Sequence, residues 1–100
     1  EVVSGSSMTN NNICYLSKED IALPLYVRSR QDGDKMYVKG LDGRKKINDI
    51  FIDKKIPMEQ RNLWPIVVDS NENIVWIPGL KKSKFDRTKG KKYDIILKYH

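Results

Sequence analysis

Apolar residues in this chain fall into short runs, separated by turns rich in Asp, Asn, Gly and Lys. Several runs have the length and the β-branched or aromatic content of strands. They cover residues 13–16, 23–30, 35–38, 65–69, 74–77 and 93–99. Apolar residues at 47, 50 and 51 recur instead at the spacing of one helix face. The pattern predicts an α+β fold of short strands with two short helices.

The strand predicted at residues 23–30 carries two arginines. Because side chains alternate along a strand, Leu25 and Val27 share one face, and Arg28 and Arg30 share the other. The turn residues at 31–34 then predict a hairpin with the strand at 35–38. Two interpretations of the arginine pair stay open: surface ion pairs with neighbouring carboxylates, or a clamp for phosphate oxygens.

A second hairpin is expected later in the chain, where residues 65–69 and 74–77 flank a polar turn. Pro78 and Gly79 end its second strand. Trp64 and Trp76 lie within or beside these apolar runs, so we expect them in the core rather than stacked on nucleic-acid bases.

The helix predicted around Ile47 and Ile50 is expected to begin at Asp42 or Gly43, either of which can cap it. Its first turn then holds Arg44, Lys45 and Lys46. The helix dipole disfavours cations there by about 0.3–1 kcal/mol each. A phosphate group would neutralise them and accept the free N–H groups. This stretch is therefore the expected functional centre.

The same helix is expected to end at Lys54 and Lys55, whose charges suit a helix C-terminus. A second helix is expected over residues 57–63, with Pro57 at its first helical position. Arg61 in this helix either pairs with Glu59 or faces a ligand. Two helices joined by a short link also resemble a DNA-binding helix-turn-helix, but the second is too short to read bases well.

Length and charge limit the classes of function. One hundred residues suit one domain, here placed at residues 13–100 after a flexible lead-in at 1–12. Nineteen Lys and Arg against thirteen Asp and Glu give a formal charge of +6 and a pI near 9.5, which favours polyanions such as nucleic acid. Neither a membrane-spanning run nor a secretion signal is found, so a cytoplasmic location is expected.

Few residues could carry out catalysis or bind a metal. Cys14 is the only cysteine and is expected to be a small buried hydrophobe, and His100 is the only histidine. No catalytic residue and no metal site is predicted, so we expect binding rather than catalysis. Residues 81–92 are expected to form a basic loop outside the core that adds weak, salt-sensitive binding. Lys89, Lys91 and Lys92 are candidates by charge alone.

Four motifs occur in one order along the chain. They are Arg28-Ser-Arg30-Gln-Asp-Gly33-Asp34, Gly43-Arg-Lys45-Lys46, Ile56-Pro57 with Arg61 and Pro65, and Val75-Trp76-Ile77-Pro78-Gly79. In order and spacing they resemble the C-terminal domain of tRNA(Ile)-lysidine synthetases. The resemblance covers about residues 12–85.

The resemblance implies a fold and a set of partners. The fold would be β-sandwich-like with two short helices, similar to a domain of the phenylalanyl-tRNA synthetase β-subunit. The parent would be a ligase that uses ATP and Mg, in an N-terminal domain absent here, to join lysine to the wobble cytidine of tRNA(Ile) with a CAU anticodon. This domain would help to recognise the acceptor stem, and the positions expected against tRNA are Arg28, Arg30, Arg44, Lys45, Lys46, Arg61, Lys54 and Lys55.

A structural role is the main alternative. In that interpretation the domain packs on the parent's own catalytic domain or forms a homodimer, and its charge serves solubility. Binding of duplex DNA through the two helices is a third alternative. A preference for tRNA over an unrelated polyanion such as heparin would favour recognition over a structural role, whereas the third alternative predicts a preference for DNA over tRNA.

Overall fold

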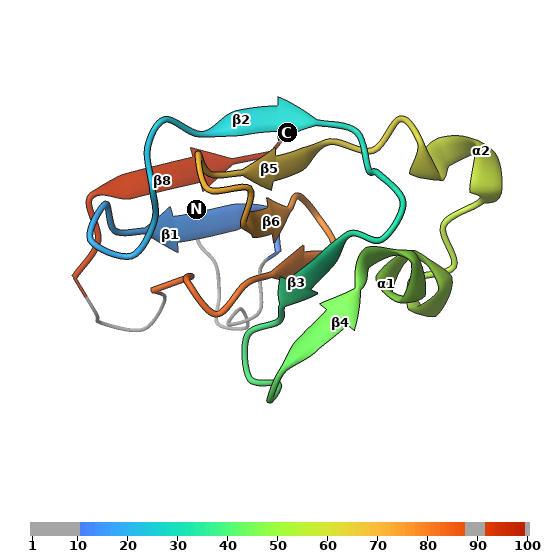
Figure 1. The fold of residues 1–100 in the computed structure, drawn as a ribbon, viewed down its shortest axis with the longest axis horizontal. Helices are drawn as coiled ribbons and strands as arrows, with labels where there is room; N and C mark the ends of the chain where they lie inside the picture. The colour runs from blue at the N-terminus through green and yellow to red at the C-terminus, as the bar shows by residue number, and fades with distance from the viewer. Residues whose placement is uncertain (1–10, 88–91, 100) are drawn as a thin grey trace.

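The structure is a computed structural model that describes residues 11–87 and 92–99. Within them the chain is mostly β, with two short helices, as expected. The strands are β1 (Ile13–Leu16), β2 (Tyr26–Arg28), β3 (Lys35–Tyr37), β4 (Arg44–Lys46), β5 (Ile66–Val68), β6 (Ile74–Ile77), β7 (Lys81–Lys82) and β8 (Ile95–Lys98). The helices are α1 (Ile47–Asp53) and α2 (Met58–Arg61), which lie together at one end of the molecule (Figure 1).

The strands form three small antiparallel sheets. The largest has the order β2-β5-β6-β7, and two ribbons are formed by β1 with β8 and by β3 with β4. The expected hairpin of β5 and β6 is confirmed. The expected hairpin of β2 and β3 is wrong, because β2 pairs with β5 and β3 pairs with β4. The pairing of β2 with β3 was expected because the two strands are close in the sequence. Strand β5 is buried, however, and its backbone groups need hydrogen-bond partners, which β2 supplies.

Two apolar clusters lie on opposite faces of β5 and β6, whose residues are all buried. Alternation sends Ile66 and Val68 to one cluster and Val67 to the other. The first cluster joins the central strands to α1 and to Met36 of β3. The second joins them to the β1–β8 ribbon. The four-stranded sheet is therefore a middle layer, with the β3–β4 hairpin and α1 on one side.

The segment Arg44–Lys46 is a strand and not the first turn of a helix. Helix α1 begins at Ile47 with Lys46 as its N-cap, so neither Asp42 nor Gly43 caps it. These three residues form a strand because their backbone groups pair with those of β3 across the hairpin. Gly43 has a φ of +88°, which lets the chain turn into β4. The expectation of three cations at a helix N-terminus is wrong.

The ends of the helices and the positions of the tryptophans agree more closely with the expectations from the sequence. Helix α1 ends as expected, with Lys54 as its C-cap. Pro57 is the N-cap of α2, so this helix begins at Met58, one residue later than expected. Trp76 is buried, and Trp64 packs against the first cluster while its indole N–H donates to the Pro78 carbonyl. The core assignment of both tryptophans is confirmed.

The predicted lead-in at 1–12 lies mostly outside the described residues. Its last two residues belong to the fold. The carbonyl of Asn11 accepts hydrogen bonds from the Gly79 N–H and the Trp76 indole, and the carbonyl of Asn12 accepts one from the Tyr99 N–H.

Candidate functional site

The β3–β4 hairpin carries a row of cations on one face. Tyr37 lies opposite Arg44, and Lys35 lies opposite Lys46, so these four side chains share a face. Met36 points the other way and is buried in the core. We call Lys35, Tyr37, Arg44, Lys46 and the adjoining Lys84 the hairpin face.

Tyr37 lies at the centre of the hairpin face, between two cations. The Arg44 guanidinium carbon is 5.8 Å from its ring centroid, and the Lys84 ammonium nitrogen is 4.1 Å from it. The Lys84 N–H donates to the Tyr37 carbonyl at 2.9 Å, and a bridge between Val38 and Ser83 holds the two segments together. Such cation–π contacts hold cations in place while leaving their charge available.

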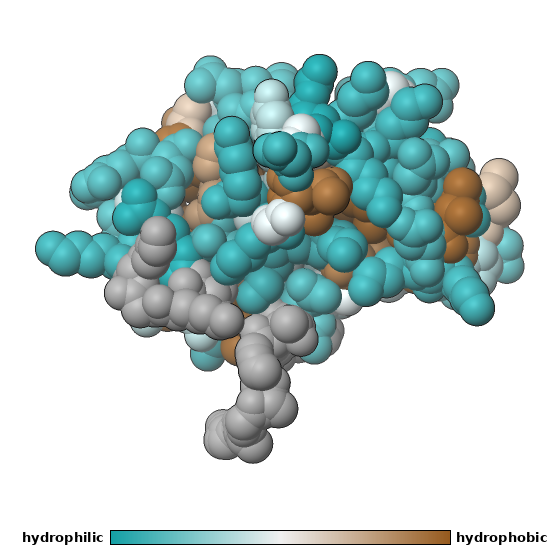
Figure 2. All heavy atoms as spheres, turned by 90° about the horizontal axis from the view of Figure 1, so that it is seen from below, coloured by the Kyte–Doolittle hydropathy of each residue, from teal (hydrophilic) through white to brown (hydrophobic). Residues whose placement is uncertain are grey.

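The hairpin face is electrostatically unbalanced. Within the described residues, Lys35, Arg44, Lys46 and Lys84 form no ion pair with a carboxylate, whereas six other Lys and Arg side chains do. Like charges directly opposite each other in a ribbon, such as Lys35 and Lys46, reduce stability. Figure 2 views the molecule from the side on which the hairpin projects in Figure 1, and hydrophilic side chains cover most of it. This arrangement favours an anionic partner.

A hollow of about 320 Å³ adjoins the hairpin face at Lys46. The residues that line it are Arg30, Gln31, Asp32, Gly33, Asp34, Lys46, Ile47 and Asn48. It brings together Arg30 and Lys46, two of the residues expected to bind RNA. Arg30 makes only a long contact, 3.9 Å, with the exposed carboxylate of Asp32.

Arg28 does not join this surface as an available cation. Its guanidinium donates two hydrogen bonds to the Asp34 carboxylate, at 2.9 and 3.1 Å, and this interaction raises the pKa of Arg28. Asp34 also accepts from the Gln31 N–H, and its carbonyl accepts from the Ile47 N–H. Of the two interpretations of the arginine pair, the ion pair describes Arg28. Arg28 thus holds in place the side chain of Asp34, which lines the hollow.

The remaining expected site residues lie elsewhere. Lys45 points away from the hairpin face and pairs with Asp53, and this contact lowers the pKa of the Asp53 carboxyl. Arg61 donates from Nε to the Ile56 carbonyl at 2.8 Å, which ties α2 to the link before it. Lys54 and Lys55 lie exposed at the end of α1. The structure therefore brings together Arg30, Arg44 and Lys46 of the eight expected residues.

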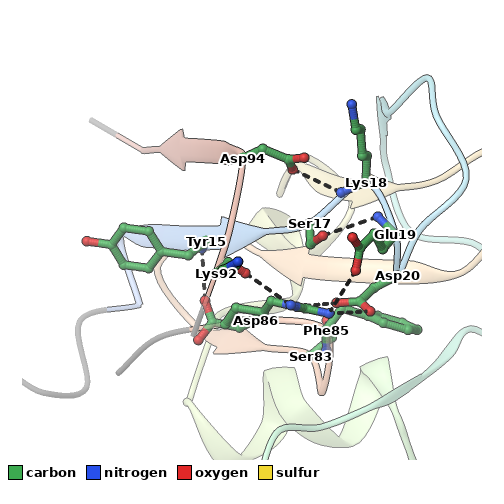
Figure 3. Close-up of polar contacts among 11 residues, drawn as sticks. Tyr15, Ser17, Lys18, Glu19, Asp20, Ser83, Phe85, Asp86, Lys92 and Asp94 are labelled. Carbon is green, nitrogen blue, oxygen red and sulfur yellow. Dashed lines mark hydrogen bonds and ion pairs between the residues drawn. The ribbon is translucent and has the colours of Figure 1, made fainter. Parts of the chain in front are cut away.

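The segment of residues 81–87 is anchored in the protein, contrary to expectation. Lys82, Ser83 and Asp86 are buried. The Asp86 carboxylate accepts from the Tyr15 N–H and pairs with Lys39 and Lys82 (Figure 3 shows the contact with Tyr15). Lysine can be buried here because a carboxylate is buried beside it, a pairing that composition alone does not show.

Cys14 confirms the expectation of a buried thiol. It has no exposed surface, and burial, with a smaller effect of the Asp86 carboxylate, raises its pKa to about 12. Such a thiol is protonated at neutral pH and is a weak nucleophile.

Arg87 fixes the end of the same segment. Its guanidinium donates to the Asp20 carboxylate at 2.6 and 2.9 Å, and to the Lys92 carbonyl at 3.1 Å. The bond to Arg87 lowers the pKa of Asp20. Of the cations chosen by charge alone, Lys89 and Lys91 lie outside the described residues, and Lys92 is exposed.

Sequence reasoning missed Lys35, Tyr37 and Lys84. The alternation in Lys35-Met36-Tyr37-Val38 already placed Lys35 and Tyr37 on one outward face. The register that adds Arg44 and Lys46 to that face, and the bridge that adds Lys84, are visible only in the folded chain.

Two further observations concern metals and membranes. The described parts of the chain hold no group of three or more His, Cys, Asp or Glu side chains placed to bind a metal ion. In the same residues, no helix has the length and apolar character that crossing a membrane requires.

Fold and site together define a small, mostly β domain that presents cations from a hairpin. The chain belongs to the family described as the TilS substrate C-terminal domain, whose model matches residues 25–96. It is thus homologous to the C-terminal part of tRNA(Ile)-lysidine synthase. A crystal structure of a TilS C-terminal domain superposes with a TM-score of 0.82 at 39% identity, covering 98% of this chain and 75% of that one.

Curated relatives give the same assignment. The tRNA(Ile)-lysidine synthase of Bacillus licheniformis is 46% identical over 97% of this chain, and that of Bacillus subtilis is 49% identical over 76%. The bifunctional protein TilS/HprT of Listeria innocua is 51% identical over 81% of this chain. The chain spans only 21%, 16% and 13% of these three proteins, respectively.

Proposed function

We propose that this chain is the RNA-docking part of a tRNA(Ile)-lysidine synthase and that the hairpin face binds the acceptor stem of tRNA(Ile). The observation that carries the proposal is the row of cations on the hairpin that no carboxylate of the described residues pairs with. It occurs in a chain of the family described as the TilS substrate C-terminal domain. Arg44, Lys46 and Lys84 contact phosphates, and Tyr37 holds two of these cations in place.

The geometry suits a duplex of A-form RNA. Proteins bind such duplexes mainly through phosphates, 2′-hydroxyls and the wide minor groove rather than through base edges. A short ribbon with outward cations can follow a phosphate backbone without entering the narrow major groove. Docking here would hold the tRNA so that its anticodon reaches an active site in another part of the enzyme, which raises the rate through proximity.

The remaining parts of the proposal concern the portion of the relatives that this chain does not span. The whole enzyme would be a ligase that joins lysine to the wobble cytidine of tRNA(Ile) with a CAU anticodon. ATP and Mg would bind in its N-terminal domain, and a cytoplasmic location goes with this activity. The likeness to a phenylalanyl-tRNA synthetase domain stays a prediction.

The test compares two double variants that lose the same charge. Arg44→Ala with Lys84→Ala removes two cations from the hairpin face. Lys18→Ala with Lys98→Ala removes two exposed cations from β8 and from the turn after β1. Binding of a tRNA(Ile) transcript and of a stem-loop copy of its acceptor stem is measured by fluorescence anisotropy across a salt series.

We expect the hairpin variant to lower affinity about tenfold or more and to reduce the slope of log affinity against log salt by about 0.7 to 0.9 for each lost phosphate contact. The control variant should retain the wild-type slope. Equal slopes in both variants would contradict docking through the hairpin face. Tight binding of the transcript without binding of the stem-loop would contradict the acceptor stem as its target.

A structural role is the second candidate, and exposed apolar side chains favour it. Helix α2 has no buried residue, and Met58 and Leu63 are 66% and 82% exposed. These side chains could pack on the parent's catalytic domain or in a homodimer. Repeating the titration of the wild-type chain with heparin decides between the two, because a scaffolding domain would bind tRNA no better than heparin, whereas a recognition domain prefers tRNA.

A further inference from the structure

We propose that the hollow beside the hairpin face holds one unpaired nucleotide of the docked RNA. Its phosphate lies against Arg30 and Lys46, and its base enters the hollow. This inference rests on the proposed function and adds to it a site that distinguishes a stem with an unpaired nucleotide from a blunt one.

Two cations flank the hollow with their charge available. Lys46 forms no ion pair with a carboxylate of the described residues, and Arg30 makes only the 3.9 Å contact with Asp32. The Nε atom of Arg30 is buried and has no hydrogen-bond partner within that part of the chain. A buried N–H group without a partner is unfavourable, and a phosphate oxygen is the acceptor that a guanidinium binds best.

The wall of the hollow is preorganised. Arg28 donates two hydrogen bonds to the Asp34 carboxylate, and its charge offsets that of Asp34 at the edge of the hollow. Asp34 also fixes the loop by accepting from the Gln31 N–H at 2.7 Å and, through its carbonyl, from the Ile47 N–H at 3.0 Å. A wall already held in place loses little entropy when a ligand binds.

Size and chemistry favour a nucleotide over a bare phosphate. At about 320 Å³ the hollow lies at the lower end of the range of about 300–1,000 Å³ found for small-molecule sites. Gln31 and Asn48 in its lining have amide groups that both donate and accept, and Asp32 accepts. Proteins read unpaired RNA bases through hydrogen bonds of this kind to base edges.

The experiment uses the 100-residue chain and two stem-loop RNAs that share one duplex. One ends blunt, and the other carries four unpaired nucleotides at its 3′ end. Asn48→Trp fills the hollow without changing charge, because Asn48 is an exposed lining residue in α1. Asn62→Trp, at the exposed end of α2, is the matched control. Arg30→Ala removes one of the flanking cations.

We expect wild type to bind the RNA with the unpaired end about tenfold more tightly than the blunt RNA. Asn48→Trp and Arg30→Ala should lose this preference, and Asn62→Trp should retain it. The backbone amide resonances of Gly33 and Asn48 should shift on adding the RNA with the unpaired end, and less on adding the blunt RNA.

Failure of this inference is distinct from failure of the proposed function. If wild type binds both RNAs equally, or if Asn48→Trp keeps the preference, the hollow is not the nucleotide site while docking through the hairpin face stands. If wild type binds neither RNA, the docking function itself is overturned, and the inference with it.

Discussion

Two groups of lysine side chains in this domain differ in whether a carboxylate pairs with them. In the first, the carboxylate of Asp86 is buried between Lys39 and Lys82 and also accepts the Tyr15 N–H. In the second, the hairpin face, Lys35 lies opposite Lys46 and no carboxylate of the described residues pairs with either. Breaking the first arrangement would destabilise the fold, because a buried charge would lose its partner. The second arrangement reduces stability, and the proposed function explains it by an anionic partner.

The comparison shows that the number of lysines says little about where a polyanion binds. The basic segment at 81–92 has the highest density of lysine in the sequence, yet Lys82 is part of a buried ion pair. Lys84, two residues later, lies over the Tyr37 ring on the hairpin face. The position of each carboxylate therefore separates structural from functional cations.

The largest expected effect follows from breaking the buried pair. Asp86→Ala removes the carboxylate that faces the buried ammonium group of Lys82 and leaves the Tyr15 N–H without its acceptor. We expect the free energy of unfolding to fall by about 3–5 kcal/mol. Urea unfolding followed by tryptophan fluorescence measures it.

The control for this prediction is Asp42→Ala, since Asp42 is exposed in the turn of the hairpin. It changes the net charge by the same amount and should leave stability nearly unchanged. A comparable loss of stability in both variants would mean that net charge, and not the buried pair, sets the result.

A second buried carboxylate gives a smaller effect that depends on pH. Burial alone would raise the pKa of Asp69, but the N–H groups of Ala22, Asn73 and Asn71 donate to its carboxylate and lower the pKa overall. A lowered pKa stabilises the fold above the usual carboxyl pKa of about 4, and this stabilisation is lost as pH falls through the folded-state pKa.

We therefore expect Asp69→Asn to reduce the free energy of unfolding by about 1–3 kcal/mol at pH 7, because the new amide presents a donor to N–H groups that need an acceptor. The difference from wild type should shrink as the pH falls below about 4. Urea unfolding at a series of pH values measures this. A difference that stays constant across the series would show that the charge of Asp69 is not the cause.

The buried region was partly predictable from the sequence, for a physical reason. Runs such as residues 66–68 and 74–77 form strands because β-branched side chains suit a buried sheet, and local pattern is enough to show it. Cys14 and Trp76 followed from the same pattern. The pairing of Asp86 with Lys39 did not, because the two residues are 47 positions apart and meet only after the sheets close.

For the hairpin face and the hollow beside it, the sequence predicted some of the residues but not how they are arranged. Arg30, Arg44 and Lys46 were expected from charge and motif, but Arg44–Lys46 was assigned to a helix because the spacing that begins at Ile47 was extended backwards. In a strand the same three residues alternate, so Lys45 points to the other face and pairs with Asp53, while its neighbours lie on the hairpin face. An error in the element thus changed which cations belong to the site.

The smallest expected effect is that of Lys35→Glu on the hairpin face, for which both the free energy of unfolding and the affinity for RNA are measured. Lys35→Glu places a carboxylate opposite Lys46 and replaces a like-charge pair by an attractive one. We expect the free energy of unfolding to rise by about 0.2–1 kcal/mol at low salt and the gain to fall as salt screens the pair. Affinity for the acceptor-stem RNA should fall in the same variant.

Opposite signs in these two measurements are what distinguish a functional surface from a structural one. Lys98→Glu in β8 makes the same change of charge opposite the apolar Ile13, so its stability should stay near that of wild type, and RNA binding should fall less. If Lys35→Glu lowers stability, Lys35 has a structural role that its exposed position does not show. If it raises stability and leaves RNA affinity unchanged, the like-charge pair of Lys35 and Lys46 does not contribute to RNA binding. The absence of paired carboxylates on the hairpin face would then not mark an RNA-binding surface.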